Sequence, residues 1–257
     1  MLLHVLLAVY AAVTGLILGS YLNVVIYRLP RRVSTVTPRS RCTACGAPIR
    51  ARDNLPLVSF LLLRGRCRSC GAPIAWRYPL IEALTALLFV ACLERFGLTP
   101  RAAAAALFCC LMVALAAIDI EHMILPDRLT LPGIVVGLLL QPWIGGVGLR
   151  AALLGALLGA SLLLALAGAW YLLRREEGMG LGDVKMLALI GAFLGWKGVL
   201  LSLFFAAFWG AAVGLALMRG SGAGLKTKLP FGAFLALGGV LTLFAGDPLI
   251  AAYLRLL

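Results

Sequence analysis

The stretch Ala151–Leu173, AALLGALLGASLLLALAGAWYLL, runs for 23 residues without a charged side chain. Its apolar residues are continuous, whereas the strands of a membrane β-barrel alternate between apolar and polar residues. An α-helix needs about 20 consecutive apolar residues to cross the hydrocarbon core of a bilayer. The stretch therefore predicts a membrane-spanning helix and sets the class of protein to which the chain belongs.

Seven further stretches have the same apolar character and complete a prediction of eight spans. They are Leu2–Tyr27, Pro79–Phe96, Ala102–Ile118, Leu129–Gly145, Val184–Trp196, Gly198–Met218 and Leu229–Leu254. The composition agrees, because 63% of the 257 residues are hydrophobic and 13% are charged, whereas a soluble domain carries about 25% charged residues. The expected fold class is an all-α integral membrane protein with about eight transmembrane helices.

The basic residues indicate how these spans are oriented. Eleven of the 23 Lys and Arg fall between Arg28 and Arg77, beside the first span, and basic loops of this kind lie on the cytoplasmic side. The predicted inner segments are 28–78, 119–128, 174–183 and 219–228, so that both chain ends lie outside. The net charge of +13 does not indicate a nucleic-acid partner, because no aromatic residues are interleaved with the basic ones.

Two copies of one cysteine phrase lie in the polar segment, CTACGAPI at Cys42–Ile49 and CRSCGAPI at Cys67–Ile74. Paired C-x-x-C turns can present four thiolates to one tetrahedral zinc ion, which leaves no open position for catalysis. Two disulfides or four free thiols are the alternatives, and a reducing cytoplasm disfavours the disulfides. We expect a small zinc-binding insert between the first and second spans. Its predicted ligands are Cys42, Cys45, Cys67 and Cys70.

Two aspartates stand at the inner ends of predicted spans. Asp119 closes the third span, and Asp183 follows alternating glycines in GMGLGDVKM, Gly178–Met186. Glycines let the backbone loop beside a carboxylate that is partly withdrawn from water, which is tolerated at membrane depth where the loop lines a cavity. Paired carboxylates that share a proton can activate water and protonate a leaving amine, and an ion or proton path is the alternative. Asp127 is expected to cap the next helix.

At these motifs the chain resembles the type IV prepilin peptidases, also called leader peptidases, of bacterial pilus and type II secretion systems. The resemblance rests on GSYLNVVIYRLP (Gly19–Pro30), the two C-x-x-C motifs, DNLPLVSFLLLRGRC (Asp53–Cys67), YPLIE (Tyr78–Glu82), DIEHMILPD (Asp119–Asp127) and GMGLGDVK (Gly178–Lys185). It implies an aspartic peptidase with Asp119 and Asp183 as its catalytic pair. Such an enzyme removes the short basic leader of a prepilin or pseudopilin, after a glycine, at the cytoplasmic face of the inner membrane.

Family members with the cysteine segment usually also N-methylate the newly exposed residue, with S-adenosylmethionine as methyl donor. The resemblance therefore assigns a methyltransfer or structural role to Asn23, Arg28 and Glu82. It implies three parts: residues 1–27 as the first transmembrane helix, 28–78 as the cytoplasmic zinc-binding and methyltransfer segment, and 79–257 as a seven-helix peptidase domain. Two alternatives stay open: a peptidase without methylation, and a non-enzymatic membrane scaffold or transporter with a zinc module.

Overall fold

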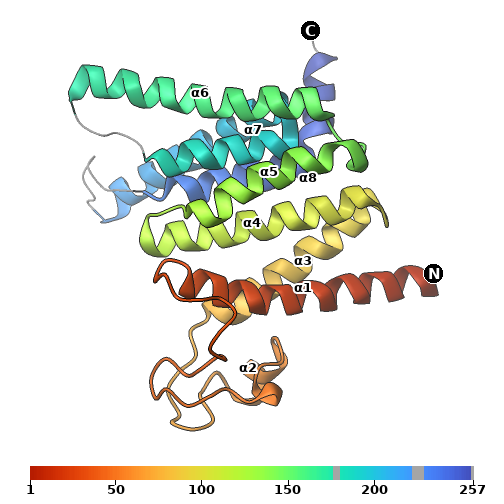
Figure 1. Cartoon of the computed structure of the whole chain (residues 1–257), viewed down its shortest axis with the longest axis vertical. Helices are drawn as coiled ribbons and strands as arrows, with labels where there is room; N and C mark the ends of the chain where they lie inside the picture. The colour runs from red at the N-terminus through yellow and green to blue at the C-terminus, as the bar shows by residue number, and fades with distance from the viewer. Residues whose placement is uncertain (176–179, 222–228, 256–257) are drawn as a thin grey trace. The chain divides into compact units, whose positions relative to one another are not determined.

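The computed structural model of the protein describes residues 1–175, 180–221 and 229–255. All regular elements over these residues are helical (Figure 1). The elements are α1 (Leu2–Arg28), the 3-10 helix η1 (Ala51–Asp53), α2 (Val58–Leu62), α3 (Arg77–Phe96), α4 (Pro100–His122), α5 (Asp127–Ile144), α6 (Leu149–Arg174), α7 (Leu181–Ser221) and α8 (Phe231–Leu254). The prediction of an all-α fold is confirmed.

Each apolar stretch identified in the sequence coincides with a helix or with part of one. The predicted sixth and seventh spans form a single element, α7, whose backbone leaves the helical region at Gly195 (φ 70°, ψ −178°). A glycine can adopt this conformation without steric cost. The break therefore lies within two residues of the predicted boundary at Lys197. Gly178 and Met179 of the glycine motif, and most of the predicted 219–228 loop, lie outside the described residues.

Five helices among the described residues are long and apolar enough to cross a membrane. They are Leu2–Arg28, Pro100–His122, Leu149–Arg174, Leu181–Arg219 and Phe231–Ala252. This is fewer than the eight spans predicted. The α3 helix carries charged residues near both ends and Glu82 in its interior, and α5 has only 18 residues and begins with two charged side chains. By length and composition alone, α3 and α5 therefore fall outside the set of candidate membrane spans.

The chain forms two compact units, Met1–Ala114 and Leu115–Leu257. In the first unit α1 packs along α3, and glycines allow the two backbones to approach closely. A methyl group placed on Gly19 would lie 2.8 Å from the Cα atom of Glu82. Small residues are the usual means by which membrane helices come this close. The predicted division into 1–27, 28–78 and 79–257 concerns function and stays a prediction.

In the second unit α7 packs against α5, α6 and α8 (Figure 1). The α6 helix approaches α7 so closely that a methyl group on Gly159 would lie 2.6 Å from the carbonyl oxygen of Leu187. The buried side chain of Gln141, in α5, donates a hydrogen bond to the carbonyl oxygen of Ala192 at 2.9 Å. These contacts fix the first half of α7, which begins two residues before Asp183.

Candidate active site and metal centre

Asp119 lies in the last turn of α4 and is buried, with 5% of its surface exposed. Its Oδ2 atom accepts a hydrogen bond of 3.0 Å from the backbone N–H of Ala233, in the first turn of α8. The backbone N–H of Gly232 also lies near this carboxylate. A helix N-terminus offers unpaired N–H donors and a partial positive charge. The start of α8 therefore holds the Asp119 carboxylate in place.

Asp183 lies in the first turn of α7 and is half-buried. Its carboxylate lies close enough to Asp119 for the two charges to interact. The side chain of Leu125 lies near both Gly182, which precedes Asp183, and Gly232, which lies beside Asp119. Methyl groups placed on Gly182 and on Gly232 would each lie 2.9 Å from Leu125 side-chain carbons, and the one on Gly232 would also lie 2.9 Å from Asp119 Oδ2. The structure therefore brings the two predicted aspartates to one place.

Gly232 and the N-terminus of α8 are parts of this site that the sequence alone does not reveal. The sequence shows only Pro230-Phe-Gly-Ala at the start of an apolar stretch. A proline two positions before a glycine is too common a pattern to indicate a partner for Asp119. The capping prediction for Asp127 is wrong in detail, because Pro126 is the cap residue. Asp127 lies one position later, in the first turn, where the helix dipole stabilises a carboxylate. Its Oδ1 atom accepts a hydrogen bond of 2.6 Å from Lys185 Nζ, with which it forms an ion pair.

The four predicted cysteine ligands form one cluster. Their Sγ atoms all lie within 4.8 Å of one another, and the Sγ atoms of Cys42 and Cys70 are 3.9 Å apart. None of the four forms a disulfide, so the disulfide alternative does not describe this structure. Zn–S bonds of about 2.3 Å in a tetrahedron require sulfurs roughly 3.8 Å apart. The cluster is close to that geometry.

The two C-x-x-C turns have the same backbone structure, as their repeated sequence predicts. In each, the glycine has φ 71° and donates its N–H to the carbonyl oxygen of the first cysteine at 2.9 Å, Gly46 to Cys42 and Gly71 to Cys67. Backbone N–H groups of Cys45 and Ala44 lower the pKa of Cys42 to about 6. Amide groups aimed at a sulfur favour the thiolate, which is the form that binds a metal.

The three residues assigned to methyltransfer by resemblance are buried where α1, α3 and the insert meet. Asn23 donates hydrogen bonds to the carbonyl oxygens of Gly19 (3.3 Å) and Tyr78 (3.1 Å), and Arg28 Nη1 donates to the carbonyl oxygen of Ser34 at 3.0 Å. Glu82 Oε2 accepts the N–H of Leu57 at 2.8 Å. Asn23 thus links α1 to the start of α3, whereas Arg28 and Glu82 each bind a backbone group of the insert.

Comparisons with known proteins agree with these features. Residues 13–96 match the Bacterial Peptidase A24 N-terminal domain, and residues 106–215 match the Type IV leader peptidase family. Proteins named prepilin leader peptidase/N-methyltransferase are similar over most of the chain. The one from Burkholderia pseudomallei (strain 1026b) is 41% identical over 93% of this chain and 85% of its own length. The one from Pseudomonas putida is 38% identical over 96% of this chain and 93% of its own length.

A further relative of the same name, from Myxococcus xanthus (strain DK1622), is 46% identical over 87% of this chain and 67% of its own length. No solved structure gives a significant match. The two matched segments divide the chain between the cysteine-bearing part and the part that carries Asp119 and Asp183.

Proposed function

Since the chain belongs to the type IV leader peptidase family, we propose that it cleaves the leader from prepilins or pseudopilins and N-methylates the new N-terminus. The observation that carries the first activity is the convergence of Asp119 and Asp183 beside the N-terminus of α8. The relatives' name, prepilin leader peptidase/N-methyltransferase, supports both activities.

In the proposed hydrolysis, Asp119 and Asp183 share one proton, because two close carboxylates cannot both ionise readily. The ionised carboxylate removes a proton from water, and the oxygen of that water attacks the carbonyl carbon of the scissile bond. The protonated partner polarises the carbonyl oxygen and later gives a proton to the leaving amine. The N–H donors at the start of α8 would keep Asp119 in position throughout, without a change in backbone structure.

The proposed role of zinc is structural. Cys42, Cys45, Cys67 and Cys70 would hold one ion with four sulfurs, a closed set that leaves no position for water. The spacing of the sulfur atoms fits such an ion. Bound there, the metal would supply folding free energy to a segment that otherwise contains only η1 and α2.

The chain is a multi-pass protein of the bacterial inner membrane, as its apolar helices and its family indicate. We place the aspartate pair and the cysteine cluster on the cytoplasmic side and both chain ends outside, on the strength of the basic residues between Arg28 and Arg77. The proposed protein partner is a prepilin or pseudopilin, whose apolar helix would enter from the surrounding lipid.

One incubation tests both activities. The purified zinc-loaded chain is mixed with a candidate prepilin and S-adenosylmethionine, and the products are analysed by mass spectrometry. The expected products are a leader that ends in glycine and a mature chain that is 14 Da heavier than the unmethylated one. A mature chain without the added mass, with all else intact, would instead favour a peptidase that lacks methylation. An uncut prepilin that related enzymes cut would refute the peptidase assignment and favour a scaffold or transporter.

A further inference from the structure

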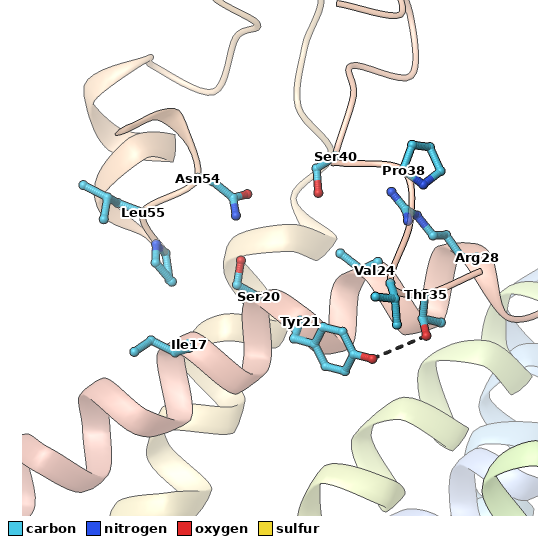
Figure 2. A pocket seen from close by; sticks show the side chains of 12 residues that line it. Ile17, Ser20, Tyr21, Val24, Arg28, Thr35, Pro38, Ser40, Asn54 and Leu55 are labelled. Atoms are coloured by element: carbon cyan, nitrogen blue, oxygen red, sulfur yellow. Dashed lines mark hydrogen bonds between the residues drawn. The ribbon is translucent and has the colours of Figure 1, made fainter. Parts of the chain in front are cut away.

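A cavity of about 510 Å³ lies in the first unit, between α1 and the loops of the insert. Figure 2 shows the α1 residues along its base, Asn54 and Leu55 on one side, and Thr35, Pro38 and Ser40 on the other. Its polar lining groups are Ser20, Tyr21, Arg28, Thr35, Ser40 and Asn54. Small-molecule sites are typically about 300–1,000 Å³ with a few convergent polar groups, so the cavity has the size and chemistry of a ligand pocket.

Arg28 is the charged residue among those that line the cavity, and only 9% of its surface is exposed. One N–H of its guanidinium donates to the carbonyl oxygen of Ser34. No carboxylate among the described residues forms an ion pair with it. A buried cation without a counter-charge is costly, and a guanidinium has five donors arranged to bind a carboxylate or phosphate. The cavity is therefore suited to a ligand that brings an anionic group.

The rest of the lining favours a ligand that is rich in hydrogen-bonding groups and has one apolar side. Four hydroxyl groups and the Asn54 amide can bond to hydroxyls and ring nitrogens, while Ile17, Val24 and Leu55 supply apolar surface. The ring of Tyr21, held by a 3.4 Å hydrogen bond from its hydroxyl to Thr35, offers a π face that can stack or attract a cation. A nucleoside that carries an amino-acid group and a positive sulfur combines these requirements.

We propose that this cavity binds the methyl donor S-adenosylmethionine, with Arg28 holding the carboxylate of its amino-acid end. The inference rests on the methyltransferase part of the proposed function. In the transfer, the neutral N-terminal amine of the cleaved substrate forms the new N–CH₃ bond. The electron pair of the broken S–CH₃ bond stays on sulfur, which becomes a neutral thioether, and the amine releases one proton to water.

Glu82 acts in this proposal as a positioning residue, since it is not among the residues that line the cavity. Its carboxylate accepts the N–H of Leu57 at 2.8 Å and lies near the side chain of Ser20. Ser20 lies at the base of the cavity, and Leu57 directly follows the wall residues Leu55 and Pro56. Glu82 therefore fixes the wall contributed by the insert against the base contributed by α1.

The test measures binding rather than turnover. The full-length zinc-loaded chain, in nanodiscs of zwitterionic lipid, is titrated by calorimetry with S-adenosylhomocysteine and with 5′-methylthioadenosine, which lacks the amino-acid end. We expect Arg28→Gln to weaken binding of the first at least tenfold and of the second less than twofold, because only the first offers a carboxylate. Arg50→Gln removes the same charge from an exposed position of the insert and should change neither affinity.

Thr35→Trp provides a second variant, because it adds a large side chain to the cavity from a loop rather than from a helix. It should weaken binding of both nucleosides at least tenfold while the zinc content stays at one per chain. Affinities unchanged in both Arg28→Gln and Thr35→Trp would overturn the proposal. If affinities are unchanged in both variants and the wild-type chain methylates a cleaved pilin, the proposed function stands and only the proposed location of the methyl-donor site is wrong. A wild-type chain that neither binds nor methylates refutes both.

A phospholipid headgroup is the other source of an anionic group for this cavity. Native mass spectrometry in nanodiscs that contain phosphatidylglycerol distinguishes it from the methyl donor. If Arg28→Gln removes retained phosphatidylglycerol and leaves S-adenosylhomocysteine affinity unchanged, the cavity is a lipid site and the proposal fails. If S-adenosylhomocysteine displaces no lipid and loses affinity in the variant, the proposal is supported.

Discussion

Gly232→Ala should impair leader cleavage although it changes neither proposed catalytic carboxylate. The added methyl group would lie 2.9 Å from both Asp119 Oδ2 and Leu125 Cδ1, about 0.6 Å closer than the ~3.5 Å at which carbon contacts are optimal. Asp119 or the start of α8 must therefore shift, and the hydrogen bond from Ala233 to Asp119 lengthens from 3.0 Å. A hydrogen bond to a charged group contributes about 1.5–3 kcal/mol, which corresponds to a loss of roughly 10- to 150-fold in kcat.

The assay is the initial rate of leader cleavage by purified protein at saturating prepilin, followed by mass spectrometry or gel shift. Gly168→Ala is the matched control, because it also adds a methyl group to a helical glycine of the second unit and meets no atom within 4 Å. The control should cleave at the wild-type rate, with equal or slightly raised thermal stability. A Gly232→Ala variant that cleaves within twofold of wild type would refute the proposed coupling between the start of α8 and Asp119.

Three further predictions concern the aspartate pair, the metal and the packing of the helices. Asp119→Asn and Asp183→Asn should each reduce leader cleavage at least a thousandfold with unchanged zinc content, and normal cleavage by either variant contradicts the paired mechanism. Metal analysis should find about one zinc per chain, and Cys42→Ser with Cys45→Ser should abolish it and make the insert sensitive to protease, whereas wild type without stoichiometric metal would contradict the cluster's role. Gly19→Ala should lower the thermal unfolding midpoint by overpacking α1 against the α3 backbone, at a cost of about 1–3 kcal/mol. A midpoint equal to wild type would show that α1 can move away at no cost.

Hydropathy and local motifs determined much of this protein without any knowledge of its structure. A helix is specified by a continuous apolar stretch, since the bilayer requires every backbone group to bond within its own segment, and each predicted stretch is helical in the structure. The cysteine cluster was equally accessible, because the repeated C-x-x-C-G turn is local and its glycine adopts φ 71° in both copies. The number of spans was less predictable, because two predicted spans form the single element α7 and because α3 and α5 are not among the described helices that are apolar enough to cross a membrane.

Tertiary structure alone decided how the proposed site is assembled. The sequence named Asp119 and Asp183, but their meeting depends on α4, α7 and α8, which are joined through Leu125 and the first turn of α8. No local pattern links Ala233 to Asp119, because a hydrogen bond between residues 114 positions apart is set by how helices pack and not by the propensity of either segment. The cavity around Arg28 arises in the same way, since its walls come from α1 and from loops that touch only after the insert has folded.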